Sequence, residues 1–206
     1  MMLTPPARHT EPLPPLPADP EVIAANSFFD FHAKGLNYVC LHRSVERTLK
    51  VYFLPETRGG IVLPHDHLYS FTTRLLAGEV VDQRYCAGSI GAKRDRLEWH
   101  SVLRGGDGFR RTGQVRRLRP TGRMHARAAG TRWATDANTI HTLKPRRWSI
   151  IELVQGPTIK TVSHTYQPAG AKLPNLDGLY RKPSVDEVLA RLRTLAALGF
   201  TWGDAA

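Results

Sequence analysis

The sequence is poor in cysteine, in acidic residues and in long apolar runs. Its 206 residues include only two cysteines, Cys40 and Cys86, which are too few for a disulfide framework in a chain of this size. No stretch reaches the roughly 18 consecutive apolar residues that a transmembrane helix requires. The first residues, Met1 to Pro6, lack a basic stretch followed by an apolar core, so we expect no signal peptide. These absences favour a cytoplasmic protein with no membrane partner.

Acidic residues are outnumbered, since 18 Asp and Glu stand against 29 Lys and Arg, which gives a net charge of +11. Such an excess makes nucleic acid or another polyanion a candidate partner. The alternative explanation of the charge, which we favour, is a general amino-acid bias in which arginine is used far more often than lysine, with no polyanion partner. Nine arginines fall within residues 104–132, where Asp107 is the only acid. This segment is interpreted as an inserted hairpin with a solvated basic face, and binding of a phosphate, a carboxylate or nucleic acid remains its alternative.

The chain divides into three segments. Residues 1–19 are rich in proline and nearly devoid of large apolar groups, which predicts a disordered arm. Residues 20–166 contain many short candidate strands separated by Gly and Pro turns, a pattern typical of an all-β sandwich or barrel. Residues 167–206 form a loop and a last helix, whose apolar stripe is expected to pack on the barrel or to form a homodimer surface.

Local signals mark both helices. Asp19 and Pro20 are a typical N-cap and first helical residue, and Gly35 would end that first helix. Ser184 and Glu187 have the spacing of a capping box, which predicts that the last helix begins there.

The segment from Gly60 to Gly78 carries the clearest chemical signal. It contains His65 and His67, and residues i and i+2 of a strand point to the same face. Two imidazoles on one strand form half of a metal site, while Asp66 between them points away. A third ligand must come from elsewhere, and His141, in a short apolar stretch before Lys144 and Pro145, is the best candidate. An H-x-H pair alone is weak evidence, because the chain has nine histidines.

Together these residues resemble the first motif of the cupin family, in which a glycine precedes H-x-H and another follows it. His65, His67 and Gly78 match the motif, Gly60 is one residue closer than the motif has it, and His141 aligns with the histidine of the second motif. The resemblance covers roughly residues 37–165. It implies an all-β cupin barrel, a double-stranded β-helix or jelly roll, here with an N-terminal and a C-terminal helix.

The resemblance departs from the family at the fourth ligand. The glutamate that many cupins provide falls at Phe71 or Thr72, so the site is expected to contain three histidines and no carboxylate. Three neutral ligands leave open positions for substrate and dioxygen, which suits iron(II) better than a closed structural zinc. Manganese, nickel and zinc remain alternatives, because imidazole binds all of them.

Three-histidine cupins include the thiol dioxygenases, and the residues around His65 resemble their cysteine dioxygenase branch. In that branch an arginine two strands earlier binds the substrate carboxylate, and Arg43 stands in about that place. The branch also uses a Ser-x-His-x-Tyr relay, whose places are taken here by Ile150, Glu152 and Val154. Its crosslinking cysteine is replaced by Thr72. These departures imply a relative that acts on a different small molecule.

Four further residues are candidates for roles in the site. Glu152 is assigned to an inward-facing position as a general base, a partner of a histidine ligand or a fourth ligand, against the alternative of an ion pair with an arginine. Tyr69 lies on the strand face of His67 and could donate a hydrogen bond to bound oxygen. Thr72 and Trp133 are candidate substrate contacts, although aromatic residues such as Trp133 are common in barrel cores.

The sequence therefore predicts a cytoplasmic iron(II) cupin oxygenase that acts with O2 on a small polar, anionic or amino-acid-like molecule. The first alternative keeps the metal as a Lewis acid in an isomerase or lyase, with Glu152 as base. The second is a basic nucleic-acid-binding or assembly protein built on a cupin scaffold.

Overall fold

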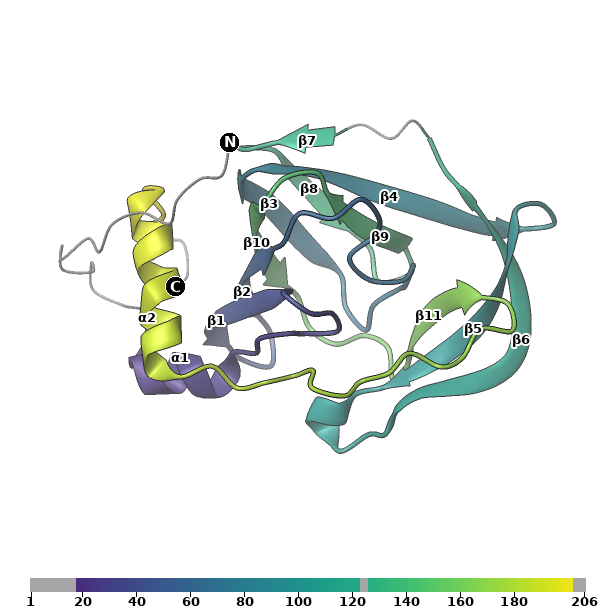
Figure 1. Ribbon diagram of the computed structural model, residues 1–206, viewed down its shortest axis with the longest axis horizontal. Helices are drawn as coiled ribbons and strands as arrows, with labels where there is room; N and C mark the ends of the chain where they lie inside the picture. Colours follow the sequence, from purple (N-terminus) through teal and green to yellow (C-terminus); the bar gives the residue numbers. More distant parts are fainter. Residues whose placement is uncertain (1–17, 123–125, 202–206) are drawn as a thin grey trace.

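The structure is a computed structural model that describes residues 18–122 and 126–201 (Figure 1). The arm predicted to be disordered lies outside these residues, except for its last two positions. No helix within the described ranges is long and apolar enough to cross a membrane. The helices are α1 (Pro20–Asn26) and α2 (Val185–Ala197), with a 3-10 turn at Val102–Arg104. The strands are β1 (Asn37–Arg43), β2 (Thr48–Leu54), β3 (Phe71–Ala77), β4 (Glu79–Gly88), β5 (Ala92–His100), β6 (Gly108–Pro120), β7 (Ala126–Ala128), β8 (Arg132–Thr135), β9 (Ile140–Pro145), β10 (Ser149–Gln155) and β11 (Ser163–Pro168).

The strands form two antiparallel sheets. The first has the order β1-β2-β10-β3-β8, and the second has the order β11-β5-β6-β4-β7 with β9 also paired to β4. Pairing is nested along the chain, since β3 pairs with β10, β4 with β9 and β5 with β6. Such nesting is a long hairpin wound into a jelly roll, or double-stranded β-helix. The expected all-β barrel with a helix at each end is therefore observed.

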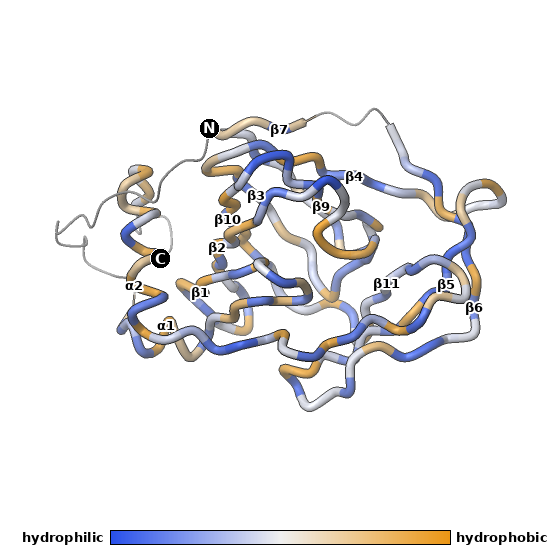
Figure 2. The backbone as a smooth tube through the Cα atoms, in the orientation of Figure 1, coloured by the Kyte–Doolittle hydropathy of each residue, from blue (hydrophilic) through white to orange (hydrophobic). Residues whose placement is uncertain are grey.

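Successive side chains of β2 point to opposite faces of the first sheet and contribute to two separate hydrophobic cores. Leu49, Val51 and Phe53 pack against α1 and α2, where Leu192 and Leu195 are fully buried. Lys50, Tyr52 and Leu54 face the other way, into the space between the sheets. Figure 2 shows α2 with alternating hydrophobic and hydrophilic bands, as expected for a helix that covers one face of a sheet. The helices thus close the outer face of the first sheet, and the inner face is left for the barrel cavity.

The helix boundaries follow the predicted signals in part. Both hydrogen bonds of the capping box between Ser184 and Glu187 are present. The first helix, however, ends at Asn26 and does not extend toward Gly35. The reason is that Phe28 forms a bridge with Tyr38 of β1, which requires extended backbone directly after the helix.

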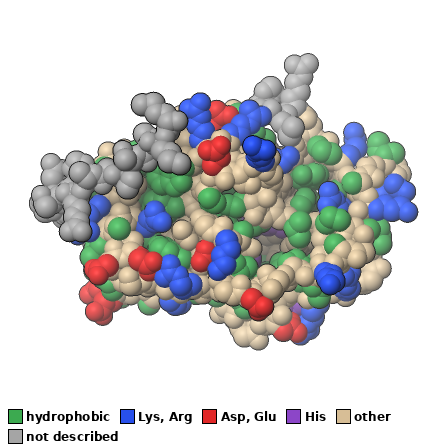
Figure 3. Space-filling view, in the orientation of Figure 1, with side chains coloured by type: hydrophobic (Ala, Val, Ile, Leu, Met, Phe, Trp, Pro, Cys, Tyr) green, Lys and Arg blue, Asp and Glu red, His purple; other side chains and the backbone are tan. Residues whose placement is uncertain are grey.

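Strand β6 holds five of the nine arginines of the arginine-rich segment, and it pairs with β5 along most of its length. Most β6 side chains are exposed, in agreement with the hairpin interpretation. In Figure 3, Lys and Arg side chains lie at the end of the molecule formed by β5 and β6.

A single residue closes the second sheet into a ring. The predicted strand Ile61–Leu63 does not form, but the chain that follows it enters the sheet at His65, which bridges to His141 of β9 on one side and to Thr165 of β11 on the other. Because β9 pairs with β4 and β11 pairs with β5, the order β4-β9-His65-β11-β5-β6 returns to β4. The main chain of His65 bonds to His141 of β9, and that of its neighbours Pro64 and Asp66 bonds to β11, so the segment is held on both sides.

Candidate metal centre

Three histidines meet on the inner wall of the barrel. His65, His67 and His141 each offer one ring nitrogen, and these nitrogens lie within 4.8 Å of one another. Nε2 of His67 lies 2.9 Å from Nε2 of His141. The sequence expectation that these three side chains share one site is met by their positions.

The main chain around the histidines is fixed by paired hydrogen bonds. The amide of His65 donates to the carbonyl oxygen of His141 at 2.9 Å, and the amide of His141 donates back at 3.0 Å. The amide of His67 donates to Ala137 at 3.0 Å. Gly60, upstream, lies so close to β9 that an added Cβ would be 2.6 Å from the hydroxyl of Thr142. The close approach explains why this position is glycine.

Hydrogen bonds to the other ring nitrogens determine which nitrogens face the cavity. Nδ1 of His65 donates to the carbonyl oxygen of Leu63 at 2.8 Å, and Nδ1 of His141 donates to Oδ1 of Asp82 at 2.7 Å. In both residues the lone pair is therefore on Nε2, which is the form of imidazole that binds a metal.

Burial favours the neutral form of His65 and His67. Burial, followed by the charge of nearby His141, lowers the pKa of His65 to about 4. Burial also lowers the pKa of His67 well below its usual value, and His65 adds to this effect. Neutral imidazoles with their lone pairs converging match the donor set of a divalent transition metal, so the residues present fit such an ion.

Asp82 of β4 supports the site from behind His141. Its side chain is fully buried and also accepts from Nε of Arg84 at 3.2 Å. Burial alone would raise the pKa of Asp82, but the hydrogen bond from His141 and the charge of Arg84 outweigh it and hold the pKa below its usual value. Asp82 is thus ionised. It orients His141 and raises the basicity of its Nε2, which makes that nitrogen a stronger metal ligand.

We predict that Asp82→Asn lowers affinity for iron(II) or zinc about 10- to 100-fold, the usual effect of removing a carboxylate behind a histidine ligand. The amide keeps the shape of the carboxylate, so the fold should be retained, as judged by circular dichroism. Competition with a chelator of known affinity measures the change. Asp95→Asn is the control, because Asp95 of β5 pairs with Arg111 and is not among the partners of the three histidines. Equal affinity of the wild type and both variants would contradict the role of Asp82.

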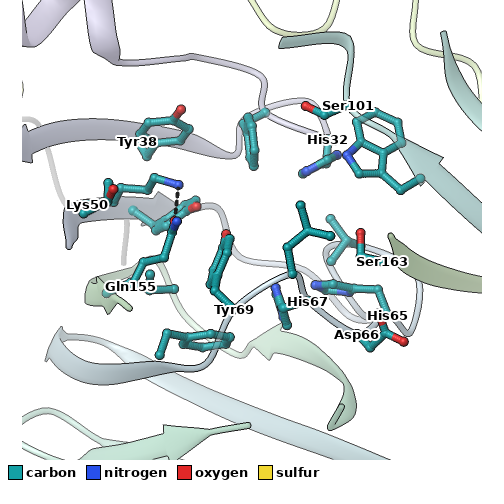
Figure 4. A pocket seen from close by; sticks show the side chains of 18 of the residues that line it. His32, Tyr38, Lys50, His65, Asp66, His67, Tyr69, Ser101, Gln155 and Ser163 are labelled. Atoms are coloured by element: carbon teal, nitrogen blue, oxygen red, sulfur yellow. Dashed lines mark hydrogen bonds between the residues drawn. The ribbon is translucent and has the colours of Figure 1, made fainter. Parts of the chain in front are cut away.

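The histidines form part of the wall of a cavity with a volume of about 600 Å³. Figure 4 shows His65 and His67 at one end and Lys50 at the other, with Tyr69 between them, and the hollow is visible in Figure 3. Much of the remaining lining is apolar or aromatic, including Tyr52, Phe71, Ile151 and Leu153. The volume lies within the range of small-molecule sites.

No family model and no curated protein matches the sequence. Solved structures of similar shape include a cupin superfamily protein from Desulfitobacterium hafniense, with 10% identity over 71% of this chain and 99% of that chain and a TM-score of 0.38. A Streptomyces nucleoside dehydratase has 11% identity over 71% of this chain and 90% of that chain, also with a TM-score of 0.38.

A third solved structure is the hydroxypropylphosphonic acid epoxidase from S. wedmorenis, with 10% identity and a TM-score of 0.38; the match covers 65% of this chain and 56% of the epoxidase. Because every TM-score is below 0.5, the double-stranded β-helix is established by the strand pairing of this chain itself. The thiol dioxygenase branch stays a prediction.

Two further predicted site residues line the cavity. The ring centroid of Tyr69 lies 5.8 Å from that of His67, and burial raises the pKa of Tyr69 to about 12, so its hydroxyl is protonated and can donate. Arg43 is exposed at the cavity, where its guanidinium donates to the carbonyl oxygen of Asn26 at 3.3 Å.

The assignment of Glu152 to an inward-facing position is wrong. On β10, Ile151 and Leu153 line the cavity, while Glu152 points to the opposite face of the sheet. There its carboxylate accepts from Arg74 of β3 at 2.5 Å, the ion pair that was the alternative interpretation. Glu152 therefore has no access to the three histidines as base or ligand.

Thr72 and Trp133 also lie outside the cavity wall. On β3, Phe71 and Thr73 face inward and Thr72 is exposed on the outer face. Trp133 of β8 is buried in the core, with the guanidinium of Arg127 4.6 Å from its ring centroid. Neither residue is placed to contact a ligand beside the histidines.

Sequence reasoning missed Asp82 and Lys50. Asp82 follows two valines in an ordinary strand pattern, and only its pairing with a strand about 60 residues later places it beside His141. Lys50 did carry a signal, since it is the only charged residue in Thr48–Leu54, a mostly apolar strand whose seven residues are all buried. A charged residue in such a run is a functional candidate.

Proposed function

We propose that this chain is a mononuclear iron(II) oxygenase that acts with O2 on a small anionic molecule. The observation that supports it most is the convergence of three imidazoles, with no carboxylate of the described residues among them, on the wall of a cavity of about 600 Å³. Such a donor set leaves coordination positions open on an octahedral ion. Iron bound there would provide redox chemistry and polarise a substrate oxygen.

The residues of the chain orient a histidine ligand, exclude water from the site and provide a hydrogen-bond donor. Asp82 holds His141 in its ligand tautomer. Phe71 packs edge-on against His67, with ring centroids 4.7 Å apart, and places an apolar ring beside the ligands. The protonated hydroxyl of Tyr69 can donate a hydrogen bond to a substrate beside the histidines. An apolar surround strengthens each of these polar contacts.

Metal analysis and oxygen uptake test the proposal together. Purified protein should bind one equivalent of iron(II), and oxygen uptake should rise with at least one member of a panel of small carboxylates that carry thiol, amine or hydroxyl groups. Substrate conversion that proceeds equally well without oxygen would instead establish the isomerase or lyase alternative. Failure to bind any divalent metal would contradict both.

A further inference from the structure

Lys50 is a buried cation at the end of the cavity remote from the histidines. Only 7% of the residue is exposed, and its ammonium donates to Oε1 of Gln155 at 3.0 Å (Figure 4). The ammonium also lies 5.2 Å from the ring centroid of Tyr38 and 5.8 Å from that of Tyr69. Over the described part of the chain, no carboxylate forms an ion pair with Lys50. Its only direct partners there are thus neutral.

A buried ammonium without a counter-ion is costly and rare. Burial lowers the pKa of Lys50 to about 8, so the side chain is still mainly charged at pH 7. The basic residues whose charges act on it, Arg43 and Arg104, also line the cavity and add positive charge. This end of the cavity therefore favours an anion.

The carboxylate that lines the cavity is already paired. Asp66 forms an ion pair with Lys160 at 3.1 Å and accepts a hydrogen bond from Nδ1 of His164 at 3.0 Å. It also accepts from the backbone amide of His164 at 2.8 Å. Asp66 consequently cannot act as the counter-ion of Lys50, so the anion must come with the ligand.

The space between Lys50 and the histidines is bounded by apolar and aromatic side chains. Tyr69 stands midway, with its ring near both Lys50 and His67. Ile151 and Leu153 of β10 provide part of the same wall. A ligand that fills this space would have an anionic end, an apolar body and a second end at the histidines.

We propose that Lys50 binds the carboxylate of an organic acid whose other end lies at the three histidines. A single ammonium with neutral hydrogen-bonding neighbours suits a monoanion, whereas phosphate sites usually gather several cationic donors. Binding of the substrate carboxylate, which the sequence resemblance assigned to Arg43, is thus assigned to Lys50. Arg43 and Arg104 attract the anion at the entrance of the cavity. The second end of the ligand rests on the proposed function, but binding of the carboxylate at Lys50 does not.

Calorimetric titration tests the carboxylate site. The ligands are phenylacetate, phenylpropionate and phenylbutyrate, with the corresponding alcohols and phenylpropyl phosphate for comparison. The proteins are the full chain with and without one equivalent of iron(II), Lys50→Met, and the control Lys93→Met on the exposed end of β5. We expect Lys50→Met to bind the best carboxylate about 10- to 100-fold more weakly, as loss of a charge-assisted hydrogen bond implies. The alcohols should bind the wild type and Lys50→Met with equal affinity. Lys93→Met should bind the carboxylates as tightly as the wild type.

The outcomes separate this inference from the proposed function. Carboxylate binding that depends on Lys50 in a chain without bound metal would support the site even if the iron chemistry failed. No binding of any carboxylate, or equal binding by wild type and Lys50→Met, would overturn it. Tighter binding of the phosphate than of every carboxylate would overturn the choice of a monoanion. Lys50→Gln, with circular dichroism as a check of folding, repeats the test with a polar side chain.

The binding should also depend on pH. Above about pH 8 Lys50 loses its proton, so affinity for the carboxylate should fall about tenfold for each further pH unit, and it should be constant below about pH 7. Other titratable groups that act on this end of the cavity include Tyr38, Tyr69, Cys40, Arg43, Arg104, His32 and His67. Burial keeps Tyr38 and Tyr69 protonated through that range, and it lowers the pKa of His32 and of His67, so both rings stay neutral. Lys50→Arg should remove the decline, and a decline that persists in Lys50→Arg would contradict its assignment to Lys50.

Discussion

Alanine in place of His65, His67 or His141 should lower affinity for iron(II) by more than about 100-fold, beyond the 10- to 100-fold typical of residues that only orient a ligand. Each substitution removes one of three nitrogens that converge within 4.8 Å, and no described carboxylate joins the group. Two remaining imidazoles hold a divalent ion far less well, because each lost ligand also removes part of the pre-formed geometry. Elemental analysis after desalting, followed by competition with a chelator, measures the loss.

His42→Ala is the matched control, because His42 is an exposed histidine at the end of β1. It should retain the full equivalent of iron. If all three cavity variants also retained it, the metal would have to bind elsewhere. If only one of them did, the site would be a two-histidine site and the proposed open coordination would need revision.

Glu152→Leu should lower the free energy of unfolding by about 3 kcal/mol without loss of metal. Its carboxylate is 10% exposed and pairs with Arg74, which is 21% exposed, so the variant leaves a largely buried guanidinium without its counter-ion. For a domain of this size the change corresponds to a fall in melting temperature of about 6–12 °C. Urea denaturation monitored by circular dichroism, with metal analysis of the same sample, provides both numbers.

The double variant Arg74→Met/Glu152→Leu is the control for this interpretation. Replacing both members of a buried ion pair by apolar residues commonly restores stability, because neither charge is then left unpaired. We expect most of the lost stability to return. Loss of iron in Glu152→Leu would mean that Glu152 acts on the histidines after all, contrary to its position on the outer face of β10.

The histidine cluster was predictable because its information is local. His65 and His67 are two residues apart, so extended backbone alone puts them on one side, and their ring centroids lie 4.6 Å apart. His141 could be chosen from the resemblance to the cupin motifs. The nested pairing that brings it there was implied by the fold and is present in the structure.

Two of the errors in the predicted site share one physical cause. Glu152 was assigned to an inward position and Thr72 was a candidate substrate contact, but each lies one residue away from an inward side chain, Ile151 or Phe71. A shift of one residue moves a strand's side chains to the opposite face of the sheet. The pairing of β3 with β10 contains a register shift between Ile150 and Ile151, an irregularity that no pattern in the sequence marks. Asp82 was missed for a related reason, since its importance arises only from a partner on β9.

The two-sided pairing of His65 also sets the order of events during synthesis. His65 is held by β9 at His141 and by β11 at Thr165, which follow it in the chain by 76 and 100 residues. Contacts of such long sequence separation form late in folding, because a large loop must close before they can. A nascent chain that has emerged only as far as β8 contains His65 and His67 but neither the third ligand nor the strands that position them. Metal capture must therefore follow translation of nearly the whole barrel.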